Sequence, residues 1–259
     1  MNSKEQKIQA FSRLLDIMDE LREKCPWDKK QTHQTLRHLT IEETYELGDA
    51  ILDNNTSEIK NELGDLLLHI VFYAKIGSET NDFDITDVCN AISDKLIYRH
   101  PHIYGDVKVA NEEDVKRNWE QLKLKEGKGK KSILEGVPKS LPAMVKASRM
   151  QDKVAAVGFE WKDTKGFLDK IQEEIIEFKV EKEKSNQDNM EAEFGDILFA
   201  LINFARHNNI NAEDALERTN KKFINRFKSV EQQAKTDGVA IAELPLKKLL
   251  AYWENAKID

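Results

Sequence analysis

The stretch EETYE at 42–46 with ELGD at 62–65 decides the fold, because it recurs 131 positions later as EEIIE at 173–177 with EFGD at 193–196. Further residues recur in the same order at offsets of 127 to 134: Trp27 as Trp161, Lys95 as Lys222, Arg99 as Arg226 and Trp119 as Trp253. A shared order with small changes of offset indicates a duplicated domain with loop insertions between its motifs.

Each copy is predicted to bring two pairs of carboxylates together on a pair of helices. Glu43 and Glu46 are three residues apart, as are Glu62 and Asp65, and residues at that spacing share one face of a helix. The two pairs are centred on residue 54, inside the turn-forming segment DNNT, so antiparallel helices would bring them level. The second copy is centred on residue 185 in the same way. The predicted sets are Glu43, Glu46, Glu62 and Asp65 in the first copy, and Glu174, Glu177, Glu193 and Asp196 in the second.

These sets predict divalent-cation sites. Like charges so close cannot all stay ionised without compensation, and Mg²⁺ takes oxygen ligands while keeping waters that phosphate oxygens can replace. Mn²⁺ is the expected substitute. A solvated acidic stripe is the alternative, but each set adjoins an apolar run, LLLHIVF at 66–72 and ILFALINF at 197–204, which we expect to be buried. His69, inside the first run, is either a core histidine or a ligand.

Composition favours an all-α protein. Glycine (11) and proline (5) are scarce among 259 residues. The net charge of −7 argues against general nucleic-acid binding. No apolar run is long enough to span a membrane, and the N-terminus lacks the apolar core of a signal peptide. With only two isolated cysteines, Cys25 and Cys89, we expect a cytoplasmic protein.

The composition changes at 122–142, which is rich in lysine, glycine and proline and predicts a linker. We therefore expect one helical domain at 1–121 and a second at 143–259.

Cations and a tryptophan in the second copy suit a nucleotide. Lys222 and Arg226 are four residues apart on one predicted helix face and fit a polyphosphate chain, although ordinary surface charge explains them equally. Trp253 is either a base-stacking residue or a core anchor. The sequence does not define a base-binding pocket.

The chain resembles the MazG family of nucleoside triphosphate pyrophosphohydrolases over nearly its whole length. Besides the four repeated motifs, the resemblance rests on CPWDKKQTH at 25–33, YRHPHIYGD at 98–106 and GVPKSLPAMVKASRMQDKVAAVGFEW at 136–161. It implies the all-α NTP pyrophosphatase fold with tandem MazG domains, a homodimer, and Mg²⁺-dependent cleavage of NTPs and dNTPs to the monophosphate and pyrophosphate.

The resemblance also implies that the second copy carries the activity, with Glu174, Glu177, Glu193 and Asp196 as metal ligands. The nucleotide contacts that it implies are Lys170, Lys222, Arg226 and Trp253. Asn189 stands where the family can place a phosphate-binding lysine.

We expect metal-assisted hydrolysis at the α-phosphorus, with Glu173 or Glu174 taking the proton from water. The first copy is either a second active site or a structural or regulatory module. For the whole chain, the alternatives are a house-cleaning hydrolase for modified nucleotides or dUTP, and a nucleotide-binding regulatory protein.

Overall fold

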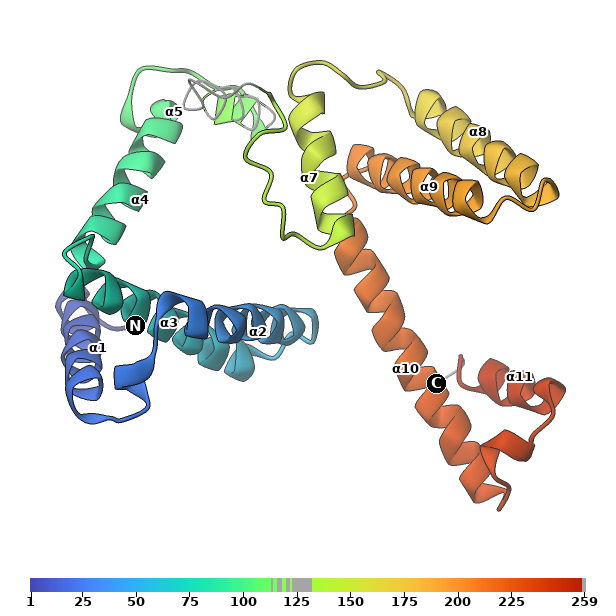
Figure 1. Cartoon of the computed structure of the whole chain (residues 1–259), viewed down its shortest axis with the longest axis horizontal. Helices are drawn as coiled ribbons and strands as arrows, with labels where there is room; N and C mark the ends of the chain where they lie inside the picture. Colours follow the sequence, from blue (N-terminus) through green and yellow to red (C-terminus); the bar gives the residue numbers. More distant parts are fainter. Residues whose placement is uncertain (113, 116–117, 120–121, 123–131, 258–259) are drawn as a thin grey trace. The chain divides into compact units, whose positions relative to one another are not determined.

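The structure is a computed structural model that describes every residue except 113, 116–117, 120–121, 123–131 and 258–259. All regular secondary structure among the described residues is helical, so the predicted all-α fold is confirmed (Figure 1). The chain divides into two compact units, Met1–Ala110 and Asn111–Asp259. Each unit contains one of the two carboxylate sets, whereas Trp119 and its match Trp253 both fall in the second unit.

The first unit is built on an antiparallel helix pair. Its elements are α1 (Lys4–Lys24), η1 (Asp28–Lys30), α2 (His33–Leu52), α3 (Thr56–Glu79), α4 (Ile85–Arg99) and α5 (Pro101–Tyr104). α2 and α3 lie side by side, and α1 packs against α3. The buried core joins the three helices through Met18, Leu36, Val71 and Phe72. Burial of these apolar side chains holds α1 on the hairpin.

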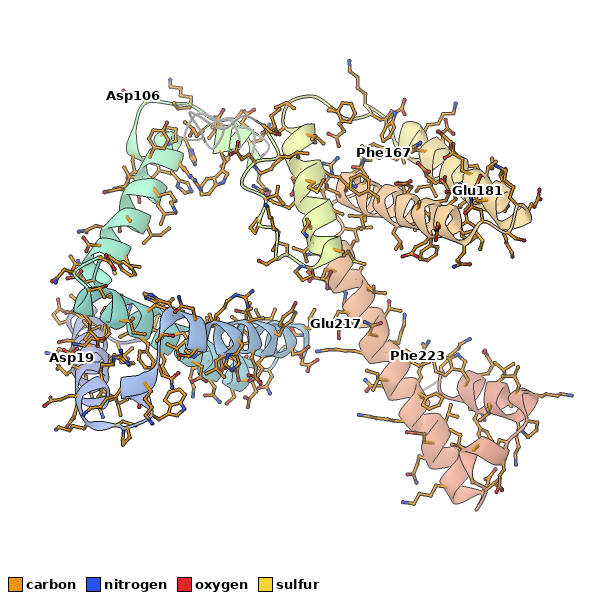
Figure 2. All side chains as sticks on the ribbon, viewed as in Figure 1. Asp19, Asp106, Phe167, Glu181, Glu217 and Phe223 are labelled. Carbon is orange, nitrogen blue, oxygen red and sulfur yellow. The ribbon has the colours of Figure 1, made fainter. Side chains whose placement is uncertain are left out.

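The second unit repeats the hairpin in a different setting. Its elements are α7 (Ala143–Ala155), α8 (Thr164–Glu183), α9 (Gln187–His207), α10 (Ala212–Thr236), η2 (Ile241–Glu243) and α11 (Leu246–Asn255). α8 and α9 form the antiparallel pair, and α7 packs on α9. Phe167 stands near the start of α8 and Glu181 near the hairpin turn (Figure 2). α11 packs on α10 around a separate cluster of Val230, Ala234, Leu244 and Tyr252.

The two hairpin turns are built alike. Asn54 (φ 54°) and Ser185 (φ 57°), the centres predicted from the motif spacing, both adopt the left-handed conformation. The following residue caps the next helix in each copy. The side chain of Asn55 accepts a hydrogen bond from the backbone N–H of Glu58, and that of Asn186 accepts one from Asn189, both at 3.3 Å. The predicted turns are therefore confirmed.

The predicted burial of the apolar runs holds only in part. His69, Val71 and Phe72 are buried in the first run. In the second run Ile202 is buried. On the other side of each helix, Ile70 in the first run and Leu198 and Leu201 in the second remain more than 40% exposed. The prediction is therefore confirmed for one side of each run and wrong for the other in the single chain.

The domain boundaries remain predictions. Residues 123–131 of the predicted linker lie outside the described residues, whereas 132–142 form turns and bends. Within the described part of the chain, no helix has the length and hydropathy required to cross a bilayer.

Candidate metal and nucleotide site

Three of the four predicted carboxylates of the second copy converge. Glu174, Glu177 and Glu193 each offer an oxygen within 4.8 Å of the others. The first two come from α8 and the third from the facing side of α9, as the spacing predicts. Glu174 is only 6% exposed, which is rare for a carboxylate without a strong partner.

A lysine compensates part of this charge. The ammonium of Lys170 lies 2.7 Å from Glu174 Oε1 and 2.9 Å from Glu173 Oε1. These hydrogen bonds, first to Glu174 and then to Glu173, raise the pKa of Lys170, so it stays charged. In contrast, lost hydration and the charges of Glu174 and Glu193 raise the pKa of Glu177. The cluster therefore keeps excess negative charge that a divalent cation would relieve.

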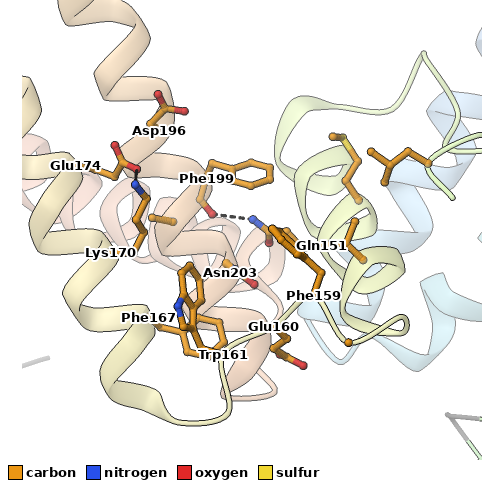
Figure 3. Close-up of a pocket in the computed structure, with 15 residues that line it drawn as sticks. Gln151, Phe159, Glu160, Trp161, Phe167, Lys170, Glu174, Asp196, Phe199 and Asn203 are labelled. Carbon is orange, nitrogen blue, oxygen red and sulfur yellow. Dashed lines mark hydrogen bonds and ion pairs between the residues drawn. The ribbon is translucent and has the colours of Figure 1, made fainter. Parts of the chain in front are cut away.

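A pocket of about 660 Å³ opens beside the cluster (Figure 3). Lys170, Glu174 and Asp196 form one charged part of its lining, and Glu160 is the other charged residue. The fourth predicted carboxylate, Asp196, thus lies at the pocket one turn of α9 beyond Glu193. Apolar and aromatic residues from α7, the 158–161 segment and α9 form most of the remaining wall, including Phe159, Trp161 and Phe199.

The sequence does not predict this pocket because its lining comes from four separate parts of the chain: Leu134 and the segments 150–161, 167–174 and 196–203. The signal available was the aromatic pair in GFEW at 158–161, close before the EEIIE helix.

The first copy also gathers three of its four predicted carboxylates, but here Glu46, not the aspartate, is absent from the converging group. Glu43, Glu62 and Asp65 offer oxygens within 4.8 Å of one another. Lost hydration is the main cause that raises the pKa of both Glu43 and Glu62, and the charge of Glu46 adds to it in each case. Glu62 Oε2 is buried and has no hydrogen-bond partner among the described residues. Carboxylate oxygens that repel one another and have no cationic partner in the described part of the chain suit a hard divalent cation in this copy too.

The surroundings of the first copy differ from those of the second. Leu39 stands at the position equivalent to Lys170, and Phe72, which is 2% exposed, at that of the pocket residue Asn203. His69 replaces Ala200 and is buried beside Tyr73, with ring centroids 6.4 Å apart. Burial lowers the pKa of His69. A neutral core histidine describes its position better than a ligand, since it is absent from the converging group.

The remaining predicted substrate contacts lie elsewhere. Lys222 and Arg226 are on α10 and Trp253 is on α11, and none of them lines the pocket. The ring centroids of Trp253 and Phe223 lie 5.0 Å apart, and the guanidinium of Arg226 lies 6.0 Å from the centroid of the Trp253 ring. Trp253 also packs against the buried cluster of α10 and α11, as a core anchor does. Asn189 donates a hydrogen bond to Glu181 at 2.8 Å, within the hairpin turn.

Comparison with known proteins matches both copies. The MazG nucleotide pyrophosphohydrolase domain matches residues 31–104 and 163–231, which contain both carboxylate sets. The chain is 43% identical to the nucleoside triphosphate pyrophosphohydrolase/pyrophosphatase MazG of Thermotoga maritima over 95% of each chain. It is 42% identical to the nucleoside triphosphate pyrophosphohydrolase of Escherichia coli K12, over 96% of this chain and 98% of that one.

A third relative, the uncharacterized protein YabN of Bacillus subtilis, is 46% identical over 98% of this chain but only 53% of its own length. The structure is that of an all-α protein with two hairpins of antiparallel helices. Each hairpin brings together carboxylate oxygens that could hold a metal ion. The chain belongs to the MazG family of nucleotide pyrophosphohydrolases.

Proposed function

We propose that this chain hydrolyses NTPs and dNTPs to the monophosphate and pyrophosphate, using Mg²⁺ held by Glu174, Glu177, Glu193 and Asp196. The observation that carries the proposal is the convergence of Glu174, Glu177 and Glu193 beside Lys170. They lie at the edge of a pocket that is large enough for a nucleoside and that Asp196 also lines. Mn²⁺ has similar oxygen preferences and is expected to substitute.

Each nearby side chain has a task in this reaction. Bound Mg²⁺ would neutralise phosphate charge and lower the pKa of a water molecule. Glu173, held by Lys170 at 2.9 Å, is placed to accept the water proton, with Glu174 as the other candidate. Lys170, whose ammonium lies 2.7 Å from Glu174, would be available to bind a phosphate oxygen if Glu174 held the cation.

Lys222 and Arg226 would stabilise charge on the departing pyrophosphate, and Trp253 and Asn189 would contact the nucleotide. The roles of Lys222, Arg226 and Trp253 require α10 and α11, from the same chain or a second copy, to approach the carboxylates.

The first copy is proposed to bind a cation without catalysing the reaction. It keeps Glu43, Glu46, Glu62 and Asp65, but Leu39 removes the lysine. Phe72 belongs to the buried core where the second copy has pocket residue Asn203. A site with leucine at the position of the phosphate-binding lysine, and with phenylalanine at that of a pocket residue, suits a structural or regulatory role.

We also propose a homodimer. Both copies expose the same apolar stripe, each member being more than a third exposed: Tyr45, Leu63, Leu67 and Ile70 in the first copy, and Ile176, Phe194, Leu198 and Leu201 in the second. The members match pairwise at the offset of 131. Exposed apolar stripes on helix hairpins favour association, and a two-fold dimer would bury each stripe against its own copy.

Light scattering after gel filtration tests the homodimer. The molar mass measured for the full chain should be twice the 29.9 kDa of a single chain. Leu198→Glu should shift it toward the monomer, whereas Leu246→Glu, at an exposed position of α11 outside the stripe, should not. A monomeric wild-type chain would overturn the proposal.

The chain's two cysteines are free, which suits the reducing cytoplasm where nucleoside triphosphates are found. We propose this compartment for the protein.

Product analysis tests the activity directly. The full chain, Mg²⁺ and each NTP or dNTP in turn should give the monophosphate and pyrophosphate, with no turnover in chelator. Release of the nucleoside diphosphate and orthophosphate would contradict the proposal. A strong preference for dUTP or modified nucleotides would favour a house-cleaning hydrolase, and tight binding without turnover would favour a nucleotide-binding regulator.

A further inference from the structure

The pocket beside the second carboxylate set contains one unexplained polar group. Gln151, on α7, is only 2% exposed and lines the pocket. Its Nε2 donates a hydrogen bond to the backbone carbonyl of Phe199 at 2.8 Å (Figure 3). A carbonyl oxygen can only accept, so this bond fixes which end of the amide faces α9.

The other end of the amide lacks a partner. Gln151 Oε1 is buried and makes no hydrogen bond within the described residues. Leaving such an acceptor unpaired is unfavourable, and native proteins rarely tolerate it without a reason. A donor that enters the pocket would remove this cost.

The rest of the pocket suits a flat aromatic ligand. Phe159, Trp161 and Phe199 contribute ring faces or edges, and Phe159 is 80% exposed. Aromatic side chains stack on any nucleobase. Because Lys170, Glu174 and Asp196 line the same pocket, a base held there would have its phosphates within reach of the carboxylates.

We propose that this pocket receives the base of the nucleotide and that Gln151 Oε1 accepts a hydrogen bond from an N–H group on the edge of the base. The inference rests on the proposed function for its substrate class. It places the base between α7 and α9 rather than on Trp253, which is packed in the α10–α11 cluster. An adenine or cytosine amino group, or a ring N–H, supplies the required donor.

The pocket also makes a prediction about selectivity. An acceptor that is buried and fixed penalises a ligand lacking the donor, because the acceptor then stays unpaired. A purine nucleotide without the 6-amino group should therefore bind more weakly than the adenine nucleotide. Inorganic tripolyphosphate, which has no base, should be insensitive to residue 151.

Binding without turnover provides the test. The full chain with Mg²⁺ is titrated calorimetrically with α,β-methylene-ATP, its analogue lacking the 6-amino group, and tripolyphosphate. In the wild type, removal of the amino group should weaken binding about 10-fold. Gln151→Met keeps a similar side-chain volume without the amide. This variant should bind α,β-methylene-ATP about 10-fold more weakly than the wild type does, and it should bind the two nucleotides with equal affinity. Tripolyphosphate should bind the wild type and the variant alike.

A matched variant and a rival variant complete the design. Gln172→Met, at an exposed position of α8 that does not line the pocket, should keep the wild-type preference for the amino group. If the preference is absent in the wild type, or is lost in Trp253→Ala but kept in Gln151→Met, the base lies elsewhere and the inference is overturned. Neither result depends on hydrolysis, so the proposed function stands or falls separately in the product assay.

Discussion

Lys170 Nζ lies 2.7 Å from Glu174 Oε1, one helical turn along α8. The pair gives the second copy an internal cation beside its most buried carboxylate. In the first copy the equivalent position is Leu39, and Glu43 has no lysine at this spacing. A divalent cation bound by Glu174 would compete with Lys170 for the same carboxylate, leaving the ammonium to a phosphate oxygen.

Lys170→Met tests this exchange. A charge-assisted hydrogen bond contributes about 1.5–3 kcal/mol, so the KM for an NTP should rise at least about 10-fold. Mg²⁺ binding by the nucleotide-free protein should stay as tight or become tighter, because Glu174 no longer has a competing partner. Steady-state kinetics and Mg²⁺ titration measure the two effects.

The control is Lys165→Met, which removes an exposed lysine paired with Asp169 on the same helix and should alter neither quantity. A wild-type KM in Lys170→Met would remove this residue from the substrate contacts.

The duplication offers matched variants for the carboxylates. Glu177→Gln should lower kcat/KM by about 100-fold or more, since an amide oxygen binds Mg²⁺ less strongly than a carboxylate. Glu46→Gln makes the same change at the equivalent position of the first copy and should leave kcat/KM within about twofold. Assay of both full-length variants with one NTP at saturating Mg²⁺ compares them directly.

Similar losses in the two variants would make both copies essential to catalysis. That outcome would contradict a non-catalytic first copy while leaving the overall activity in place.

The spacing of the motifs was enough to predict the hairpins and the converging carboxylates. Residues 54 and 185 could be identified as turn centres because helical geometry relates sequence distance to position within one hairpin. Glu174, Glu177 and Glu193 follow from the same rule. Local geometry of this kind needs no information from distant parts of the chain.

Other features depend on packing between distant segments and could not be predicted. Gln151 is a site residue only because α7 packs on α9, and nothing within α7 itself indicates this. The apolar runs at 66–72 and 197–204 look alike in sequence, and each has a buried and an exposed side: Phe72 and Ile202 are buried, whereas Ile70 and Leu201 are each more than 40% exposed. A run of apolar residues predicts burial but not whether the covering surface belongs to the same chain.

Ser185 should carry a measurable conformational cost. Its φ of 57° is unfavourable for a residue with a side chain, by about 1–2 kcal/mol. Ser185→Val, which adds β-branching, should destabilise the second unit by about 1 kcal/mol or more, and Ser185→Gly should be neutral or slightly stabilising. Urea unfolding measures both.

Lys184→Val is the neighbouring control, since Lys184 has a φ of −74° that valine can adopt. If Ser185→Val and Lys184→Val were equally destabilising, the left-handed turn would not be the cause.

The ion pair between α1 and α3 gives a prediction about pH. Arg22 Nε lies 2.7 Å from Glu79 Oε1, and Arg22 Nη2 lies 2.8 Å from Glu79 Oε2. The hydrogen bond to Arg22 is the main cause that lowers the pKa of Glu79 below 4.5. A carboxylate with a lowered pKa stabilises the fold above the pKa of the unfolded chain. That stabilisation is lost as the pH falls through the folded value.

Glu79→Gln should therefore weaken the attachment of α1 at pH 7 but have progressively less effect as the pH falls below about 4.5. Glu79 is 38% exposed, so solvent screening limits the expected loss to about 0.5–1 kcal/mol. Amide hydrogen exchange of α1, compared between the wild type and the variant at each pH, measures it. Lys24→Met breaks an exposed pair within α1 alone and serves as the control. A difference between the wild type and Glu79→Gln that persists unchanged at pH 3.5 would mean that Glu79 acts through packing rather than through its charge.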